Sequence, residues 1–280
     1  MCIFCAAKQS SVHGPWQARR AFLLAGGALA GEAAIGQVNV GQSSELRKLV
    51  PAEELETASR QQYGEMMQEA KSKGALAPAN HPQLVRLRSI AQRIIPYTNT
   101  WNSRAANWQW EVNLIGSKQI NAFCMPGGKI AFYTGILDQL KLSDDETAMV
   151  MGHEMAHALR EHARARIAKS QGTGALLSIG AQLLGLGQLG DVAANLGTQL
   201  LTLKFSRDDE SDADLVGLEL AARAAYDPQS SVSLWQKMGQ ASGNNGASFL
   251  STHPSGPQRI AQLQANVPRV QGLYDAARKR

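Results

Sequence analysis

Residues 153–157 read His153-Glu154-Met155-Ala156-His157, and they decide how the rest of the chain is interpreted. On an α-helix, His153 and His157 lie one turn apart on the same face. Two imidazoles at this spacing can bind one metal ion, and Glu154 can then take a proton from the attacking water, as in zinc peptidases. The pattern also occurs by chance in about one chain in a hundred, so the surrounding sequence has to agree with it.

The residues around the motif predict the helix that it requires. Ser143 and Glu146 have the spacing of a capping box, which marks a helix N-terminus. Residues 144–168 include no proline and a single glycine, and apolar residues recur at helical spacing, so we expect one long helix there. On such a helix His162 would lie about half a turn away from His153. We therefore interpret His162 as a surface or packing histidine.

A catalytic zinc ion usually has three protein ligands, so one more ligand is needed. The residues after His157 lack the glycine and the spacing of a third histidine ligand. In the segment 206–214, Glu210 and Asp214 are four residues apart and share a helix face. Glu210 would bind the metal, and Asp214 would accept a hydrogen bond from a ligand imidazole. An acidic first helix turn, favoured by the helix dipole, is the alternative explanation.

The order and spacing of several motifs resemble the HtpX-like and CAAX-prenyl-protease-like zinc metallopeptidases, in their soluble bacterial branch. The resemblance covers roughly residues 83–265 and rests on Asn121-Ala122-Phe123, Pro126-Gly127-Gly128, residues 153–157, Glu210 through Asp214 with Gly217, and Thr252-His253-Pro254. It implies that His153, His157 and Glu210 bind one Zn²⁺ per chain, with Glu154 as the general base. One departure is Asp212, where the family often has a glutamate.

The expected fold is α+β and mostly helical, of the zincin type, with a small β-sheet beside the metal-binding helix. Three segments are predicted strands: 108–115, 119–125 and 129–134. An edge strand there would bind the substrate backbone by strand addition, and Asn121, Ala122 and Phe123 are its candidate substrate-binding residues. Helices are predicted over 45–73 and 84–95.

Four segments are expected along the chain: an export signal over 1–30, a helical segment and linker over 31–82, the metallopeptidase domain over 83–267, and a C-terminal tail over 268–280. Arg19-Arg20 and the short apolar run after them resemble a twin-arginine export signal, which predicts a periplasmic location. An ordinary secretory signal or an uncleaved anchor are the alternatives. Without residues 1–30 the chain has 25 basic and 23 acidic residues, a net charge of +2, which gives no reason to expect nucleic-acid binding.

The segment 173–203 is rich in leucine, glycine and glutamine, with no charged residue between Lys169 and Asp191. Its many small and polar residues argue against a membrane span, so we expect a helical hairpin or a lid over the cleft. Weak contact with a membrane stays open, because membrane-embedded relatives have spans near here. Cys124 would be the one cysteine left after signal removal, and we expect it to pack in a strand.

His253 could reach the site, where it would stabilise the oxyanion or occupy the open metal position as a latch. The alternatives are a loop histidine that packs the turn, and an oxyanion role for Arg207 or Tyr226 instead. The resemblance alone implies that unfolded or misassembled envelope proteins are the substrates of this metalloendopeptidase. Two other functions are retained: a chaperone-like client-binding protein with a latched, rarely active zinc site, and a structural zinc protein whose metal is fully ligated.

Overall fold

The computed structural model describes residues 38–169, 200, 203–241, 248–253 and 256–280. Contacts within the chain divide it into Met1–Ile35 and Gly36–Arg280, and the description below concerns the second unit. The expected export signal and most of the expected 173–203 hairpin lie outside the described residues.

A three-stranded sheet forms the β part of the fold. Its strands are β1 (Glu111–Ile115), β2 (Ala122–Met125) and β3 (Lys129–Tyr133), in the order β1-β3-β2. The central strand β3 runs parallel to β1 and antiparallel to β2. β2 is therefore an edge strand, as the sequence predicted. β1 begins three residues later than expected, at Glu111, whose amide donates to the Gly128 carbonyl. A short 3-10 helix, Ser103–Asn107, precedes it, and the Trp110 indole donates to the Ala105 carbonyl in this helix.

The turn between β2 and β3 depends on two glycines. Gly127 and Gly128 have φ angles of 86° and 79°, in the left-handed region that disfavours other residues. A Cβ at Gly128 would also lie 2.7 Å from the Trp110 ring. These glycines allow the tight hairpin that places β2 at the sheet edge.

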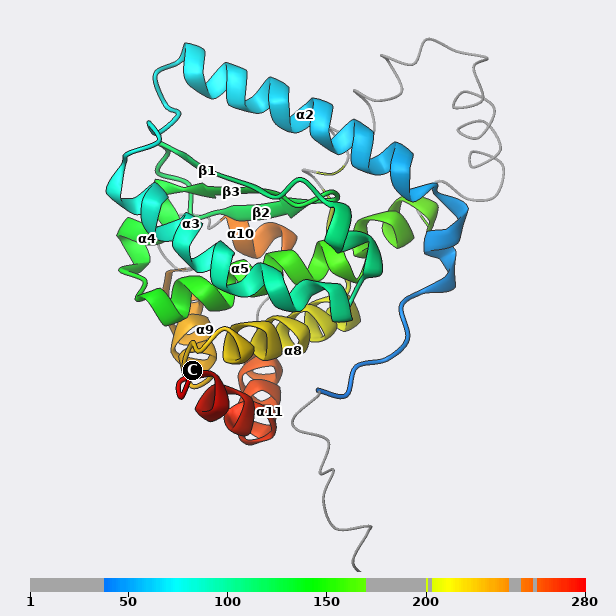
Figure 1. Ribbon diagram of the computed structural model, residues 1–280, viewed down its shortest axis with the longest axis vertical. Coiled ribbons are helices and arrows are strands. Elements are labelled where there is room, and N and C mark those ends of the chain that lie inside the picture. Colours follow the sequence, from blue (N-terminus) through cyan, green and yellow to red (C-terminus); the bar gives the residue numbers. More distant parts are fainter. Residues whose placement is uncertain (1–37, 170–199, 201–202, 242–247, 254–255) are drawn as a thin grey trace, which may run out of the picture. The chain divides into compact units, whose positions relative to one another are not determined.

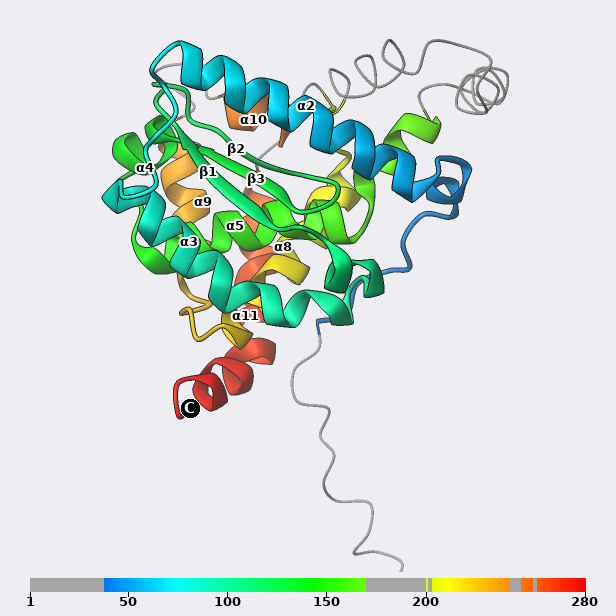
Figure 2. The same ribbon diagram turned by 45° about the horizontal axis from the view of Figure 1, so that its top comes forward.

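Helices cover both faces of the sheet (Figures 1 and 2). The helices are α2 (Ala52–Ser72), α3 (Pro82–Ile94), α4 (Thr134–Leu140), α5 (Asp144–Leu159), α8 (Arg207–Arg223), α9 (Ser230–Ala241), α10 (Ser248–Thr252) and α11 (Pro257–Ala277), with 3-10 helices at Glu45–Leu49 and Ile95–Thr100. α2 lies across one face, where the Tyr63 hydroxyl donates to the Ile130 carbonyl of β3 at 2.6 Å. α3 and α5 lie on the other face, with α8, α9 and α11 beyond them.

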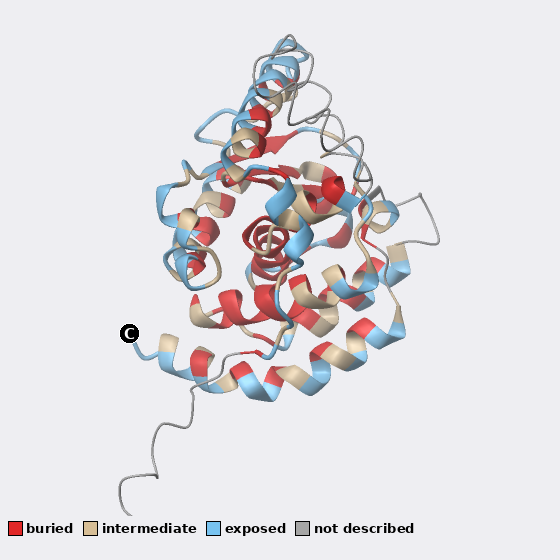
Figure 3. Cartoon of the chain, turned by 90° about the vertical axis from the view of Figure 1, so that its right-hand side faces the viewer, coloured by how far each residue is buried: buried red, intermediate tan, exposed pale blue. Residues whose placement is uncertain are grey.

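The expected α+β, mostly helical architecture is confirmed. Helix α11 continues through residue 267, where the sequence suggested a boundary. Figure 3 shows buried residues gathered in the interior and exposed residues on the outer helices. In the part of the chain that the structure describes, no helix is both long enough and apolar enough to cross a bilayer.

The central helix α5 is buried from Glu146 to Leu159. The predicted capping box is present: Ser143 accepts from the Glu146 amide, and the Glu146 carboxylate accepts from the Ser143 amide. The prediction of one helix over 144–168 is wrong, because the helix ends at Leu159 and resumes at residue 162. Glu161, in the break, has a φ of 59°.

Tertiary contacts hold this break in place. Asn102 donates to the Leu159 carbonyl at 3.0 Å and so satisfies a group at the end of α5. The Glu161 carboxylate pairs with Arg47 at 3.0 Å, and Arg164 also binds it. The chain therefore changes direction directly after the histidine motif.

Candidate metal centre

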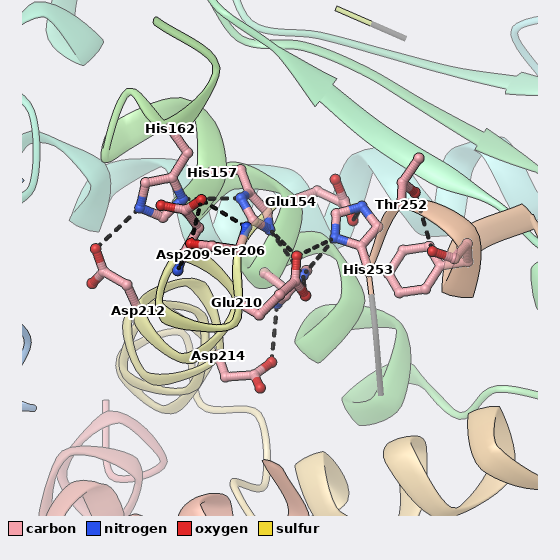
Figure 4. Close-up of polar contacts among 12 residues, drawn as sticks. Glu154, His157, His162, Ser206, Asp209, Glu210, Asp212, Asp214, Thr252 and His253 are labelled. Carbon is pink, nitrogen blue, oxygen red and sulfur yellow. Dashed lines mark hydrogen bonds and ion pairs between the residues drawn. The ribbon is translucent and has the colours of Figure 1, made fainter. Parts of the chain in front are cut away.

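The histidine motif lies in the buried middle of α5, facing α8 (Figure 4). The Nε2 atoms of His153 and His157 are 3.1 Å apart. Both imidazoles are 3% exposed, which excludes a role as ordinary surface histidines. The helical spacing that the sequence suggested therefore does bring the two rings together.

Helix α8 brings Glu210 to the same point. Glu210 Oε2 lies 3.5 Å from His153 Nε2, and Glu210 Oε1 lies 3.5 Å from His157 Nε2. Ser206 caps this helix in a capping box with Asp209, so the alternative of an acidic first turn does account for Asp209. It does not account for Glu210, which is 1% exposed and faces α5.

The structure also brings His253 into the cluster, from the end of α10. Its Nδ1 lies 2.9 Å from Glu210 Oε1 and 3.3 Å from His153 Nε2. The rings of Phe249 and Phe205 stack against its ring at centroid distances of 4.4 and 5.4 Å. His253 is therefore a buried member of the site. The ligand atoms of His153, His157, Glu210 and His253 all lie within 4.8 Å of one another.

The donor set fits a divalent cation. His153 Nδ1 lies 3.0 Å from the Asp214 carboxylate, so it carries the proton and leaves a lone pair on Nε2. Burial first, and then the neighbouring His153, His162 and His253, lower the pKa of His157 well below its usual value, which keeps this imidazole neutral. The Nε2 atoms of His153 and His157 and the Glu210 carboxylate thus present acceptor atoms to one another, which a bound cation would satisfy.

Glu154 stands beside this cluster with one unsatisfied carboxylate oxygen. Its Oε1 atom is buried and accepts no hydrogen bond from the residues that the structure describes. Burial raises the pKa of Glu154, and the nearby His253 and His153 only partly oppose that rise. A carboxylate with a raised pKa is suited to accept a proton and return it.

Asp214 occupies the position that the sequence predicted, behind His153. Burial would raise the pKa of Asp214, but Arg259 and the hydrogen bond with His153 outweigh it and lower the pKa to about 2. The carboxylate therefore stays ionised, which fixes His153 in the tautomer with the proton on Nδ1.

Arg259 is a part of the site that the sequence analysis missed. Its Nη1 lies 2.7 Å from Glu210 Oε2, and its Nη2 and Nε lie 2.6 and 2.7 Å from the Asp214 carboxylate. The guanidinium also stacks over the Trp235 ring, 3.5 Å from its centroid. A signal existed in the sequence: on α11, Arg259 is in register with the buried apolar residues, which are Leu263, Val267, Val270 and Leu273.

Of the two interpretations of His162, surface or packing, the structure contradicts the surface one, and the ring does not point away from the motif. It is 5% exposed, and its Nδ1 lies 2.9 Å from Nδ1 of His157. The sequence argument assumed an unbroken helix, whereas the break at Glu161 turns His162 back toward the motif. Asp212 Oδ2 lies 3.1 Å from the other ring nitrogen of His162.

A cavity of about 240 Å³ opens next to the cluster. Residues of edge strand β2 line it, together with Glu154, His157 and His253. The predicted substrate-binding residues line it as well: Asn121, Ala122 and Phe123. The sequence pattern thus located both the cluster and the strand beside it.

The two other oxyanion candidates lie apart from this cavity. Arg207 is exposed in the first turn of α8 and lines a different cavity of about 670 Å³, together with Glu210 and Arg259. Tyr226 is buried beyond the opposite end of α8, where Arg93 stacks on its ring at 4.2 Å. Tyr226 therefore does not reach the site.

Comparisons with known proteins agree with this geometry. The chain is 34% identical over 212 residues to mitochondrial metalloendopeptidase OMA1 of Schizosaccharomyces pombe, covering 75% of this chain and 60% of the relative. It is 40% identical over 159 residues to the Arabidopsis thaliana protein of the same name, covering 56% of this chain and 32% of the relative. It is 29% identical over 203 residues to metalloprotease LoiP of Escherichia coli, covering 70% and 75%.

The chain spans less than two thirds of the length of these mitochondrial relatives. The model of one peptidase family matches residues 83–267, which is more than half of the chain and contains every residue of the cluster described above. The resemblance inferred from the motifs is therefore confirmed at the level of the family, and this chain belongs to peptidase family M48.

Proposed function

We propose that this chain is a zinc-dependent endopeptidase that hydrolyses peptide bonds. The observation that supports it most directly is the convergence of His153, His157 and Glu210 beside Glu154, whose buried Oε1 atom has no hydrogen-bond donor among the described residues. Two histidines and a glutamate form a common ligand set of catalytic zinc. The chain's membership of a peptidase family supports the same conclusion.

Different groups of the site would carry out different parts of the hydrolysis. A bound zinc ion would act as a Lewis acid on the scissile carbonyl and lower the pKa of the attacking water. Glu154 takes the proton from this water and passes it to the leaving amine. His253, whose Nε2 lies 3.6 Å from Glu154 Oε1, lies close enough to donate a hydrogen bond to the developing oxyanion.

Strand β2 is suited to hold the substrate in an extended conformation. Asn121 accepts from the Tyr133 amide of β3 at 3.1 Å. Because the hydrogen-bonding direction alternates along an antiparallel strand, Ala122 and Cys124 direct their main-chain groups away from β3; the Ala122 N–H already donates to Asn121 Oδ1 at 3.0 Å, which leaves the Cys124 N–H and the two carbonyl groups for a substrate. A substrate that pairs with these main-chain groups is bound with little regard to its side chains. This supports unfolded or misassembled proteins as the substrates.

The proposed setting is the periplasm, with a role in envelope protein quality control. The support for export is the twin-arginine-like pattern at residues 19–30. The similarity to LoiP of Escherichia coli agrees with a bacterial setting. Fractionation of cells that express the full chain, with and without Arg19→Lys and Arg20→Lys, tests this part, and retention of the wild type in the cytoplasm would contradict it.

A second candidate function is favoured by the position of His253. Its Nδ1 lies as close to the cluster as a fourth ligand would. A fourth protein ligand would close the position that the attacking water needs. The chain would then be a chaperone-like client-binding protein with a latched, rarely active zinc site.

Hydrolysis of fluorescein-labelled casein, combined with zinc content by mass spectrometry, tests both functions. We expect Glu154→Gln to abolish hydrolysis while it retains zinc, and Glu210→Gln to lose zinc as well. Hydrolysis by Glu154→Gln would overturn the proposed mechanism. His253→Ala separates the two functions: a latch predicts a faster enzyme, and an oxyanion donor predicts a slower one.

A further inference from the structure

We infer that His162 is a positioning residue for His157, and that it acts through a chain of hydrogen bonds that ends on Asp212. This inference rests on the proposed function, in which His157 binds the metal through Nε2. The inferred hydrogen bond is at Nδ1 of His157, on the side of this ring that faces away from the cluster.

The contacts form a continuous line from the cluster into α8. His157 Nδ1 lies 2.9 Å from His162 Nδ1, and His162 Nε2 lies 3.1 Å from Asp212 Oδ2. Arg160 Nε donates to the same Asp212 oxygen at 2.7 Å. Figure 4 shows His162 beside His157, with Asp212 beyond it.

The direction of each hydrogen bond follows from this order. When His157 Nε2 binds a metal, the proton of this neutral ring is on Nδ1, which must donate. His162 Nδ1 must then accept, so its own proton is on Nε2. That Nε2–H faces a carboxylate oxygen, which can only accept. Every contact in the line thus pairs one donor with one acceptor, and it specifies one tautomer for each ring.

The break in the helix makes this line possible. On a continuous helix, His162 would be five residues after His157 and about 140° further around the axis. The left-handed conformation of Glu161 turns the chain so that the ring centroids of the two histidines are 5.0 Å apart. A non-glycine residue in this conformation costs about 1 kcal/mol or more of folding free energy. Backbone strain of this kind is often found at functional sites, and here it allows His162 to contact His157.

The two ligand histidines are therefore oriented in different ways. His153 donates directly to Asp214, which Arg259 holds from behind. His157 donates to His162, which in turn donates to Asp212, and Arg160 binds the same carboxylate. The other face of His157 is covered by Phe205, which stacks on it at a centroid distance of 4.0 Å. Stacking does not fix the rotation of the ring within its own plane, whereas the hydrogen bond to His162 does restrain it.

Zinc affinity provides the first test, measured on the full chain by competition with a fluorescent chelator. Phe fills the space of His162 without an acceptor, whereas the Asn side-chain oxygen can replace Nδ1. We expect H162F to weaken zinc binding by about 10- to 100-fold, the usual effect of losing a residue that hydrogen-bonds a metal ligand. H162N should restore most of the zinc affinity. Ser231→Ala, which removes a buried hydrogen bond to the Pro228 carbonyl, is the control and should leave zinc affinity unchanged.

The tautomers provide the second test, which needs no substitution. Long-range proton–nitrogen NMR spectra of the zinc-loaded wild type should show His162 protonated on Nε2 and His157 protonated on Nδ1. A proton on Nδ1 of His162 would overturn the inference, and so would equal zinc affinity of H162F and wild type. Failure of the wild type to bind zinc would instead overturn the proposed function, so the two failures are distinguishable.

Discussion

Gly152 of α5 and Gly217 of α8 bring the backbones of their helices into contact. A Cβ at Gly152 would lie 2.7 Å from the Gly217 carbonyl oxygen, and a Cβ at Gly217 would lie 2.6 Å from the amide nitrogen of His153. The contact is one residue away from the first candidate metal ligand. The separation of the two helices, and with it the distance from His153 to Glu210, therefore depends on the absence of two side chains.

Gly217→Ala is expected to push the helices apart. Overpacking of this kind costs about 1–3 kcal/mol of unfolding free energy, and it should also weaken zinc binding because Glu210 moves with α8. Urea unfolding and chelator competition measure the two effects. Gly272→Ala on α11 is the control, since nothing lies within 4 Å of its added Cβ, and we expect unchanged zinc affinity and up to about 1 kcal/mol of added stability. Wild-type zinc affinity in Gly217→Ala would contradict this account.

Arg259→Met should destabilise the metal-free protein far more than the zinc-bound protein. The substitution leaves the buried carboxylates of Glu210 and Asp214 without their cation, which costs about 3–5 kcal/mol in comparable sites. Bound zinc would replace part of the lost positive charge. Urea unfolding with chelator and with saturating zinc measures the difference.

Two variants accompany that measurement. Arg259→Lys keeps the charge and should lose less stability than Arg259→Met. Arg278→Met removes an exposed arginine near the end of α11 and should change the free energy of unfolding by less than about 0.5 kcal/mol. If Arg259→Met lost the same free energy with and without zinc, Arg259 would have no electrostatic link to the metal.

Cys124→Pro tests whether β2 binds the substrate backbone. Proline removes the Cys124 amide hydrogen, which points away from β3, so the sheet itself should tolerate the change. Loss of one substrate hydrogen bond should lower kcat/KM by about 3- to 10-fold while zinc content stays unchanged. Cys124→Ala keeps the amide and should behave as the wild type. If both variants were equally slow, the side chain and not the main chain would be responsible.

The stability that Glu146 contributes should disappear at low pH. Burial would raise the pKa of Glu146, but the contacts with Lys237, the Ser143 amide and the Ser233 hydroxyl outweigh it and lower the pKa. The stabilisation is therefore complete at pH values above the pKa of Glu146 in the unfolded chain, which is about 4.3. It is lost as the pH falls through the lower pKa of Glu146 in the folded protein. Glu146→Gln should cost about 1–2 kcal/mol at pH 7, and less at pH 3.

Chemical unfolding of wild type and Glu146→Gln at both pH values provides the measurement. Glu65→Gln, on the exposed side of α2, is the control and should change the free energy of unfolding by less than about 0.5 kcal/mol at either pH. A cost of Glu146→Gln that grew toward low pH would contradict the assignment.

The parts of the site that could be predicted from sequence are those with local rules. Spacing along a helix relates His153 to His157 and Glu210 to Asp214, and the capping pattern at Ser143 locates the start of α5. The strands could be predicted because alternating residues and two glycines mark the hairpin. In each case the information lies within a few residues.

The parts that could not be predicted depend on contacts between distant segments. Arg160, Glu161 and His162 contain neither glycine nor proline, so nothing local indicates the helix break; Asn102 and Arg47 stabilise it from elsewhere in the chain. For Arg259, the register with the buried apolar residues of α11 indicates a buried position, but a single arginine on a helix is usually exposed and nothing local identifies its carboxylate partners. Its role appears only when α11 packs against α8.

The scattered origin of the site has a consequence for how the protein is made. His153 and His253 are separated by 100 positions, and Arg259 comes later still. A growing chain on the ribosome that has not yet reached Arg259 cannot complete the site, however well its first helices have formed. Because Arg259 holds the carboxylates of Glu210 and Asp214, these two groups are fully positioned only after the final helix has docked.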